Sequence, residues 1–165
     1  MKFQRAVYAG SFDPFTNGHF DIAFRGMRLF DELVIAVGEN PKKNYTLTLE
    51  QRMGIIEETM TKASEGLDVA VRVTSFQGLL VEYCRQINAN IILRGLRAVT
   101  DFEFEFQIGL ANMDMIPSIE TVFLLSEPSN IFISSSLIKE IAYNGGNVDK
   151  YLPEPALNAL KQALL

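Results

Sequence analysis

Long hydrophobic runs are missing from this 165-residue sequence, and no stretch approaches the roughly 20 apolar residues that a transmembrane helix needs. The residues at its start, MKFQR, lead into no apolar segment of the kind that directs export. Cys84 is the sole cysteine, which excludes an intramolecular disulfide and agrees with a reducing compartment. We therefore expect a cytoplasmic protein with no membrane association.

Positive charge is also scarce, because 15 Lys and Arg face 20 Asp and Glu and give a formal net charge of −5. Affinity for nucleic acid comes largely from neutralising phosphates, so we expect no nucleic-acid partner. Small anionic ligands are still compatible with this balance if the few cations gather around the ligand. With 48% hydrophobic and 21% charged residues, the chain has enough apolar side chain for one globular core.

Short apolar segments alternate with helical patterns along the chain, without an internal repeat or a linker. This alternation predicts an α/β, Rossmann-like fold: a parallel five-stranded sheet with helices on both faces, in a single domain. The predicted strands are 5–9, 33–37, 69–76, 90–94 and 120–125. The predicted helices are 18–30, 48–64 (opened by a capping box at Thr48), 79–87, 100–113, one capped by Ser134 or Ser135 and ending at 145–146, and 157–165. Ligands of such sheets bind beyond the carboxyl ends of the strands.

The first polar motif, GSFDPFTNGH (10–19), follows the first predicted strand. Gly10 allows a close turn, and Gly18 and His19 begin a helix whose free N–H groups suit a phosphate. His19 is the only histidine, and its imidazole could donate to a phosphoryl oxygen. The alternative is an ordinary strand–helix loop with a surface histidine. The motif matches neither the GxGxxG loop of dinucleotide-binding proteins nor the GxxxxGK[ST] P-loop.

The second motif, RGLRAVTDFEFE (94–105), places Arg94 and Arg97 just beyond the fourth predicted strand. Two planar guanidinium groups at a strand end suit a phosphate. The alternative is that both arginines pair with Asp101, Glu103 or Glu105 as a solvated charge cluster. The third motif, NIFISSS (130–136), leads into a helix, where its serines either cap the helix or cradle phosphate.

Together the three motifs resemble those of the nucleotidylyltransferase superfamily, [T/H]xGH, RGLRxxxDFExE and ISS[S/T], and the resemblance covers nearly the whole chain. Thr16 and the RGLR segment point to the phosphopantetheine adenylyltransferase branch. Phe104 stands where tyrosine is common in that branch, and Asn130 where an aromatic residue is frequent. The implied fold is a single nucleotidyltransferase domain over residues 1–165, and the implied assembly is a homohexamer. The alternation of Phe102, Phe104 and Phe106 with acids hints at an interface on that helix.

The resemblance also implies roles for single residues. His19 would bind the ATP phosphates and stabilise the transition state, with Lys43 meeting the reacting phosphate and Arg94 holding the phosphate of the acceptor. ATP would contact Ser11, Phe12, His19, Gly95, Leu96, Arg97, Glu105, Asn130, Ile131, Phe132, Ile133, Ser134, Ser135 and Ser136. The acceptor, 4′-phosphopantetheine, would contact Ser11, Lys43, Leu80 and Arg94. For Lys43 the plain alternative is a solvated basic turn, for Leu80 it is packing on a helix face, and for Cys84 we expect structural burial.

The implied reaction converts ATP and 4′-phosphopantetheine to dephospho-coenzyme A and pyrophosphate. A phosphate monoester has a second pKa of about 6 and needs no general base to act as the nucleophile. Mg²⁺ is expected as a cofactor bound mainly through the ATP phosphates, since the sequence has no dense carboxylate cluster and indicates no protein metal ligand. Two rival interpretations are a related transferase, acting on nicotinamide mononucleotide or making a cytidylyl derivative of glycerol phosphate, and a non-catalytic nucleotide-binding module.

Overall fold

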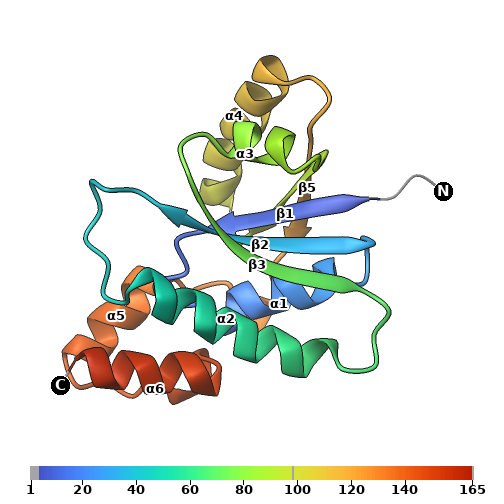
Figure 1. Cartoon of the computed structure of the whole chain (residues 1–165). Coiled ribbons are helices and arrows are strands. Elements are labelled where there is room, and N and C mark those ends of the chain that lie inside the picture. Colours follow the sequence, from blue (N-terminus) through green and yellow to red (C-terminus); the bar gives the residue numbers. More distant parts are fainter. Residues whose placement is uncertain (1–3, 98, 165) are drawn as a thin grey trace.

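A single parallel sheet forms the centre of the molecule in the computed structural model, which describes residues 4–97 and 99–164. Its strands are β1 (Arg5–Gly10), β2 (Glu32–Glu39), β3 (Ala70–Gln77), β4 (Ile91–Leu96) and β5 (Glu120–Leu125). They lie in the order β3-β2-β1-β4-β5, and every neighbouring pair is parallel (Figure 1). The predicted α/β fold with five parallel strands is confirmed.

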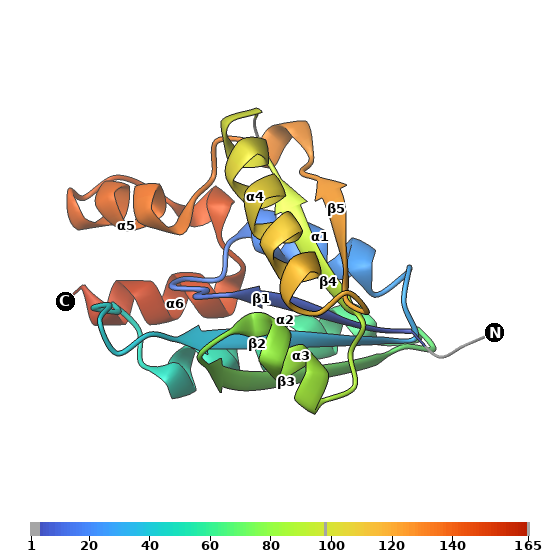
Figure 2. The ribbon, with the colours of Figure 1, turned by 90° about the horizontal axis from the view of Figure 1, so that it is seen from above.

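Helices cover both faces of this sheet (Figures 1 and 2). The helices are α1 (Asn17–Gly26), α2 (Leu49–Ser64), α3 (Leu80–Gln86), α4 (Val99–Met115), α5 (Ser135–Tyr143) and α6 (Glu154–Ala163). Two short 3₁₀ turns, η1 (Pro128–Asn130) and η2 (Asp149–Tyr151), flank α5. α1, α2, α5 and α6 lie on one side of the sheet, and α3 and α4 lie on the other. No helix in the described part of the chain is long and apolar enough to cross a membrane.

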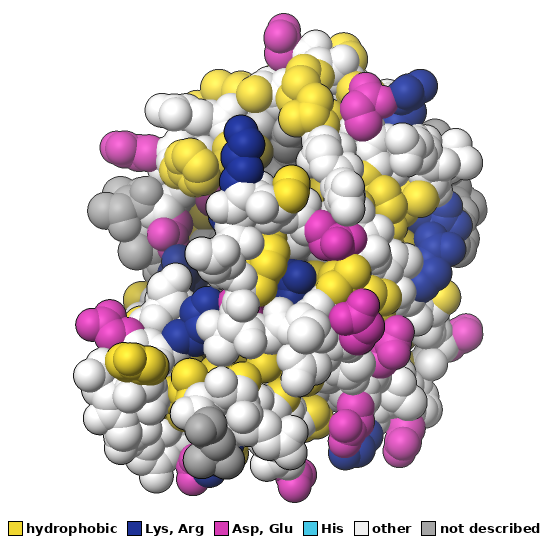
Figure 3. Space-filling model, turned by 60° about the vertical axis from the view of Figure 1, so that its left-hand side comes forward, with side chains coloured by type: hydrophobic (Ala, Val, Ile, Leu, Met, Phe, Trp, Pro, Cys, Tyr) yellow, Lys and Arg dark blue, Asp and Glu magenta, His cyan; other side chains and the backbone are white. Residues whose placement is uncertain are grey.

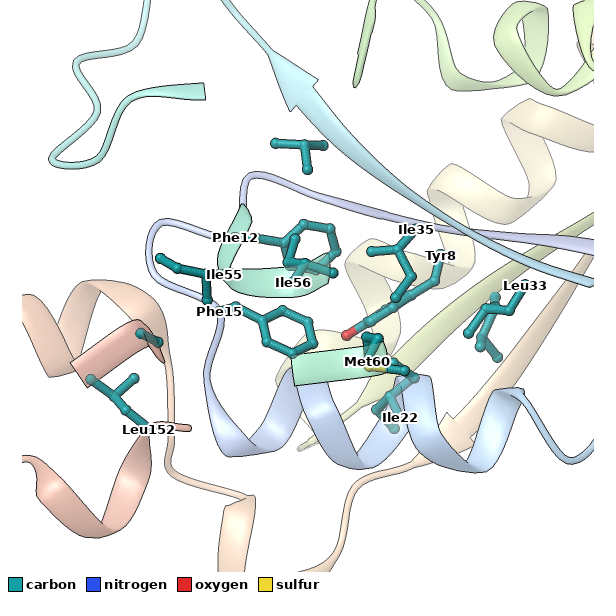
Figure 4. Close-up of a cluster of buried hydrophobic side chains, with 14 of the residues drawn as sticks. Tyr8, Phe12, Phe15, Ile22, Leu33, Ile35, Ile55, Ile56, Met60 and Leu152 are labelled. Carbon is teal, nitrogen blue, oxygen red and sulfur yellow. The ribbon is translucent and has the colours of Figure 1, made fainter. Parts of the chain in front are cut away.

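The side covered by α1 and α2 holds the larger hydrophobic cluster. Tyr8 of β1, Ile35 of β2 and Ile56 of α2 meet in it, together with Phe12 and Phe15 from the turn after β1 (Figure 4). Burial of such side chains typically stabilises a fold by about 1.5–3 kcal/mol each. The turn that carries the first motif is therefore anchored in the core, so its polar residues are held by packed neighbours.

The helix ends depart from the sequence prediction in two places. α1 ends at Gly26 and not near Phe30, and the N–H groups of Arg28 and Leu29 close a turn there. A Cβ on Gly26 would lie 2.6 Å from Leu93 Cδ2, so this position needs the close approach that glycine gives. α6 begins at Glu154 and not at Leu157, because Pro155 sits in the first turn, where no backbone N–H is required.

The strand order reverses between β1 and β4, which is where parallel sheets of this kind bind ligands. The chain leaves β1 toward β2 and β3 and returns to the other side of β1 as β4. The segments that follow β1 and β4 diverge from this point, and the first and second sequence motifs occupy those two segments. The topology thus brings the two motifs to one edge of the sheet.

Candidate active site

Several cavities open at the carboxyl edge of the sheet, and three of them are lined by residues of the predicted motifs. The largest set of predicted site residues lines a cavity of about 260 Å³, here called the arginine cavity because Arg94 and Arg97 lie in its wall. Its wall also includes Phe12, His19, Gly95, Glu105, Ile133, Ser134 and Ser135. Residues from all three motifs therefore share one cavity. Figure 3 shows this side of the molecule, where several Lys and Arg side chains lie among polar and hydrophobic surface.

A capping box at the start of α1 fixes the His19 side chain. Thr16 is the N-cap, and its hydroxyl accepts from the His19 backbone N–H at 3.3 Å. In return the Thr16 backbone N–H donates to Nδ1 of the His19 ring at 3.0 Å. Because Nδ1 accepts this bond, the ring proton resides on Nε2. The spacing of threonine and histidine in the first motif is thus the spacing of an N-cap and the third residue of its helix.

Two phenyl rings enclose the same imidazole. Phe15 stacks on it at 5.7 Å between centroids, and Phe12 meets it edge-on at 5.1 Å. Burial, followed by the positive charges of Arg97 and Arg94, lowers the pKa of His19 to about 4. His19 is therefore a neutral hydrogen-bond donor near pH 7, with its Nε2–H available to a ligand.

The turn before His19 is shaped by an unusual backbone conformation at Phe12, whose φ is +49°. A non-glycine residue in this left-handed region costs on the order of 1–3 kcal/mol and persists only where packing holds it. The Phe12 ring is buried against the backbone of Gly10, where a Cβ would lie 2.9 Å from Phe12 Cε1. Glycine at position 10 thus permits the ring position that supports His19.

Arg94 is held at the end of β4 by a two-pronged ion pair. Its Nε donates to a Glu105 carboxylate oxygen at 2.6 Å, its Nη2 donates to the other oxygen, and its Nη1 donates to the Ala9 carbonyl at 3.2 Å. A guanidinium carries five N–H groups, so two are left for a ligand. The pairing with an acid considered from the sequence is present, and it orients Arg94 along the cavity wall.

Arg97 connects the second motif to the third. Its Nε donates to Asp101 at 3.0 Å, and its Nη1 donates to the Ile133 carbonyl at 3.0 Å. Ser134 is the N-cap of α5, and its hydroxyl accepts from the Leu137 N–H at 3.2 Å. Ser135 donates from its hydroxyl to the Pro14 carbonyl at 2.8 Å, which ties α5 to the first motif. Two of the three serines therefore have structural bonds at the rim of the site.

A second cavity, of about 400 Å³, lies on the other side of His19. Lys43 and Lys139 are in its wall, so it is called the lysine cavity here; Ser11, Phe12, Ser135 and Ser136 contribute as well. A third cavity, of about 230 Å³, is called the leucine cavity because Leu80 lines it, together with Ser11 and Arg94. His19 is common to the arginine and lysine cavities, and Arg94 is common to the arginine and leucine cavities.

Four of the predicted contact residues lie outside the walls of these three cavities. Leu96 is buried in the core at the end of β4, and Asn130, Ile131 and Phe132 form the approach to α5. Asn130 still lies beside the helix end, since its Cβ is 3.7 Å from the point where a Cβ on Gly18 would be. Their proposed contacts with ATP stay predictions.

Two charged residues near the site were not predicted from the sequence. Lys139 lines the lysine cavity and donates to Asp13 at 2.7 Å. It follows Ser135 by four positions, so a helix beginning at the third motif places both side chains on one face, and that spacing was the available signal. Arg52 of α2 is buried and donates to the carbonyls of Ser11 and Gly38. These two bonds link the segment after β1 to the end of β2. No sequence pattern distinguishes Arg52 from a surface arginine.

Cys84 is on the buried face of α3, in the core, as expected. Burial raises the pKa of its thiol to about 12, which keeps it protonated and unreactive near neutral pH. Over residues 4–97 and 99–164, no group of three His, Cys, Asp or Glu side chains could hold a metal ion. The chemistry available at the site is therefore that of one neutral imidazole, two arginines, two lysines and helix N-termini, which suits the binding of phosphates.

Comparison with known proteins agrees with a phosphate-handling site. Residues 7–141 match the model of the cytidylyltransferase-like family. The chain therefore belongs to the cytidylyltransferase-like family, a family of nucleotidyltransferases. Among its relatives, a phosphopantetheine adenylyltransferase from Syntrophotalea carbinolica is 46% identical over 98% of this chain and 94% of its own. One from Dictyoglomus thermophilum is 47% identical over 91% of this chain and 88% of its own. Within the family, the chain falls in the phosphopantetheine adenylyltransferase branch.

A solved structure supports the fold independently. The nicotinic acid mononucleotide adenylyltransferase of Plasmodium falciparum, complexed with NaAD, superposes with a TM-score of 0.72. The match covers 99% of this chain and 97% of that one, at 14% sequence identity. At this identity the likeness concerns the fold, and the acceptor must be argued from the site.

Proposed function

We propose that this enzyme transfers the adenylyl group of ATP to 4′-phosphopantetheine and releases pyrophosphate and dephospho-coenzyme A. The observation that carries the proposal is the position of His19, whose imidazole borders both the arginine cavity and the lysine cavity. An adenylyl transfer brings two phosphates together in line, and a donor between two cation-lined cavities serves that geometry. The relatives at 46% and 47% identity carry the name of this activity.

In the proposed reaction, an oxygen of the acceptor phosphate attacks the α-phosphorus of ATP, and the bond to the bridging oxygen of pyrophosphate breaks. The acceptor is already largely dianionic near neutral pH, so the enzyme needs no base. His19 is unsuited to be one, because its Nδ1 already accepts from Thr16 and its Nε2 carries the proton. Donation from Nε2–H to an α-phosphoryl oxygen would stabilise the charge that develops there.

The remaining residues are proposed to hold the two substrates. Arg94 has two unused N–H groups at the border of the arginine and leucine cavities, which suits the phosphate of an acceptor whose arm extends past Leu80. Lys43 is exposed on the wall of the lysine cavity, where it can reach a phosphate beside His19. ATP would occupy the arginine cavity, between the end of β4 and the start of α5.

Mg²⁺ is proposed to enter with ATP, coordinated by the triphosphate, where it would neutralise part of the phosphate charge. Glu105, in the wall of the arginine cavity, is engaged by Arg94, and Asp101 is engaged by Arg97. Turnover should therefore depend on Mg²⁺ in proportion to the fraction of ATP that is complexed. Titration of Mg²⁺ at several fixed ATP concentrations checks this, and a requirement that saturates independently of ATP would contradict it.

The assembly and location of the protein are proposed by analogy with this branch. We propose a homohexamer in the cytoplasm. The exposed phenylalanines of α4, Phe102, Phe104 and Phe106, support a subunit contact, since exposed apolar surface commonly marks an interaction site. Phe102 and Phe106 stack on each other, and Phe104 lies on a different face of the helix.

A pyrophosphate-release assay with purified protein tests the function. We expect release with ATP plus 4′-phosphopantetheine, and formation of dephospho-coenzyme A in equal amount. Nicotinate mononucleotide, nicotinamide mononucleotide and glycerol phosphate serve as alternative acceptors, and CTP serves as the alternative donor. Turnover of one of these in preference to 4′-phosphopantetheine and ATP would assign a different transferase. ATP binding without turnover of any acceptor would favour a non-catalytic module.

A further inference from the structure

Asp13, in the turn between Phe12 and Pro14, is a buried carboxylate whose contacts reach two other segments. It is 4% exposed. Oδ1 accepts from the Leu47 N–H at 2.9 Å, and Oδ2 accepts from the Thr46 N–H at 3.0 Å and from the Lys139 ammonium at 2.7 Å. A buried carboxylate needs such donors, because removal from water is costly. One side chain thus joins the turn after β1, the loop before α2 and helix α5.

These contacts place two lysine side chains, Lys43 and Lys139, on the wall of the lysine cavity. Lys43 lies three residues before Thr46 in the loop that Asp13 anchors, and Lys139 is bound to Asp13 directly. Both lysines line the lysine cavity beside His19. A lysine ammonium has three N–H donors, and the Asp13 bond uses one. The other two remain for an anion in the cavity.

The Asp13–Lys139 pair differs from the other lysine pairs of the molecule in its surroundings. Its side chains are 5% and 28% exposed, and its ammonium borders a cavity. The Asp149–Lys161 pair, between η2 and α6, is 54% and 59% exposed and borders none of the three cavities of the site. Exposed pairs of this kind contribute little to stability. A lysine held by a buried acid at a cavity wall is oriented for a ligand.

We propose that Lys139 binds a phosphoryl group of the reacting substrates in the lysine cavity, and that Asp13 is a positioning residue that holds its ammonium there. The ligand class is a phosphate or polyphosphate anion, contacted by Lys43 and Lys139 together. The inference rests on the proposed function, since that function brings two phosphorylated substrates to His19. It adds a contact residue, Lys139, and a residue that acts through it, Asp13.

Lys139→Gln is the central variant, because glutamine keeps a donor for Asp13 and removes the positive charge. Lys161→Gln is the matched control at the exposed pair. We expect Lys139→Gln to fold with an unfolding midpoint close to that of the control. Its Kd for inorganic pyrophosphate, measured by calorimetry, should rise about tenfold to a hundredfold, the usual worth of a charged hydrogen bond. Lys139→Arg should restore most of this affinity.

The kinetic arms identify which substrate is contacted. A rise in KM for ATP without one for 4′-phosphopantetheine assigns the contact to the nucleotide, and the reverse assigns it to the acceptor. Either result supports the proposal. Binding of pyrophosphate and kcat/KM values within twofold of the Lys161→Gln control would overturn it.

A double-mutant cycle tests the positioning role of Asp13. If Asp13 acts through Lys139, Asp13→Asn lowers kcat/KM in the wild-type background and has little further effect in Lys139→Gln. If the two substitutions lower kcat/KM independently, so that their effects multiply, that role is overturned. A purely structural acid would give this result. Pyrophosphate binding requires no turnover, so a protein that binds pyrophosphate through Lys139 but forms no dephospho-coenzyme A would refute the proposed function and leave the cation site standing.

Discussion

At the scale of single residues, the site uses histidine as a neutral donor. The Thr16 amide occupies Nδ1, two phenyl rings restrict the imidazole, and two arginines oppose its protonation. A donor in that state can follow charge as it develops on a phosphoryl oxygen without competing as a base. Preorganised donors of this kind are typically worth a factor of about 10² to 10³ in rate.

Substitution His19→Ala should therefore lower kcat by about 10²- to 10³-fold or more while the fold is retained. The loss arises because the transferring phosphoryl oxygens lose their donor. Steady-state kinetics and far-ultraviolet circular dichroism measure the two quantities. Turnover close to wild type in a folded variant would remove His19 from the mechanism.

The protonation state of His19 gives a second prediction, which is easily read because the chain has one histidine. Long-range ¹H–¹⁵N correlation spectra of the free enzyme should show the Nε2–H tautomer, without titration between pH 8 and 5.5, since the folded pKa is about 4. A midpoint near the ordinary value of about 6.5 would contradict it.

The same shift makes stability depend on pH with a defined sign. Between about pH 6.5 and 4 the unfolded chain binds a proton at His19 that the folded chain does not, so acid favours unfolding in this window. Relative to His19→Gln, the wild type should lose free energy of unfolding as the pH falls from 6.5 toward 4. Urea unfolding at pH 7.5, 6, 5 and 4.5 measures this, and parallel profiles for the two proteins would be inconsistent with the shift.

A substitution at Gly18 tests whether ATP binds close to the start of α1, without disturbing the fold. A Cβ there would meet Thr16 Oγ1 at 3.6 Å and Asn130 Cβ at 3.7 Å, which are ordinary contacts, and Gly18 lines the arginine cavity. We expect Gly18→Ala to keep or raise the melting temperature, because alanine favours a helix. Its Kd for ATP should rise by about tenfold, as overpacking of about 1–3 kcal/mol predicts. Unchanged ATP binding would show that the nucleotide stays away from this helix end.

At the scale of the elements, two helices begin with the same device and allow a matched comparison. Thr16 caps α1 with His19 as its partner, and Thr48 caps α2 with Gln51. Loss of either cap should cost about 0.5–2 kcal/mol of stability. Thr16→Ala keeps the backbone N–H that donates to the His19 ring but loses the hydroxyl that accepts from the His19 backbone N–H. The start of α1 that positions the ring is then less firmly held, so kcat should also fall, whereas Thr48→Ala should leave kcat near wild type. Equal kinetic effects of the two variants would mean that the box has no role in orienting His19.

The sequence predicted the order and type of these elements better than their ends. Strand and helix periodicity is a property of neighbouring residues, and it located all five strands within one or two residues. The need for glycine at position 26, the last residue of α1, comes from its packing against Leu93 of β4, a contact between segments far apart in the chain. The ion pair of Lys139 is also non-local, since its partner Asp13 lies 126 residues away, and the four-residue spacing from Ser135 was the local signal for its position at the site. Candidate site residues could be predicted where they are consecutive in the sequence. They could not be predicted where the fold brings distant residues together.

At the scale of the whole molecule, the net charge of −5 coexists with a cluster of cations at one edge of the sheet. Some acidic side chains at this edge are paired with cations, as Glu105 is with Arg94, and other acids lie elsewhere. This division lets an acidic protein attract two phosphorylated substrates to one place. On α4, Phe104 is 65% exposed, on a different face of the helix from the stacked pair of Phe102 and Phe106.

Assembly should depend on that face of α4. If the protein is a hexamer through this surface, Phe104→Glu would place a charge in an apolar contact and shift the mass in solution toward smaller species. Leu29→Glu, at a position 54% exposed in the turn after α1, is the control. Light scattering coupled to size exclusion measures both. An unchanged mass for Phe104→Glu, or an equal change for Leu29→Glu, would place the subunit contact elsewhere.

The burial of Cys84, on the inner face of α3, has a practical consequence. A lone thiol that is inaccessible in the native state and reactive once released reports on the departure of α3 from the sheet. Under native conditions, its rate of modification by a disulfide reagent would report how often that layer opens, without any added label. Comparing the rate with and without bound nucleotide would then measure how far events at the strand ends reach through the sheet to its opposite side.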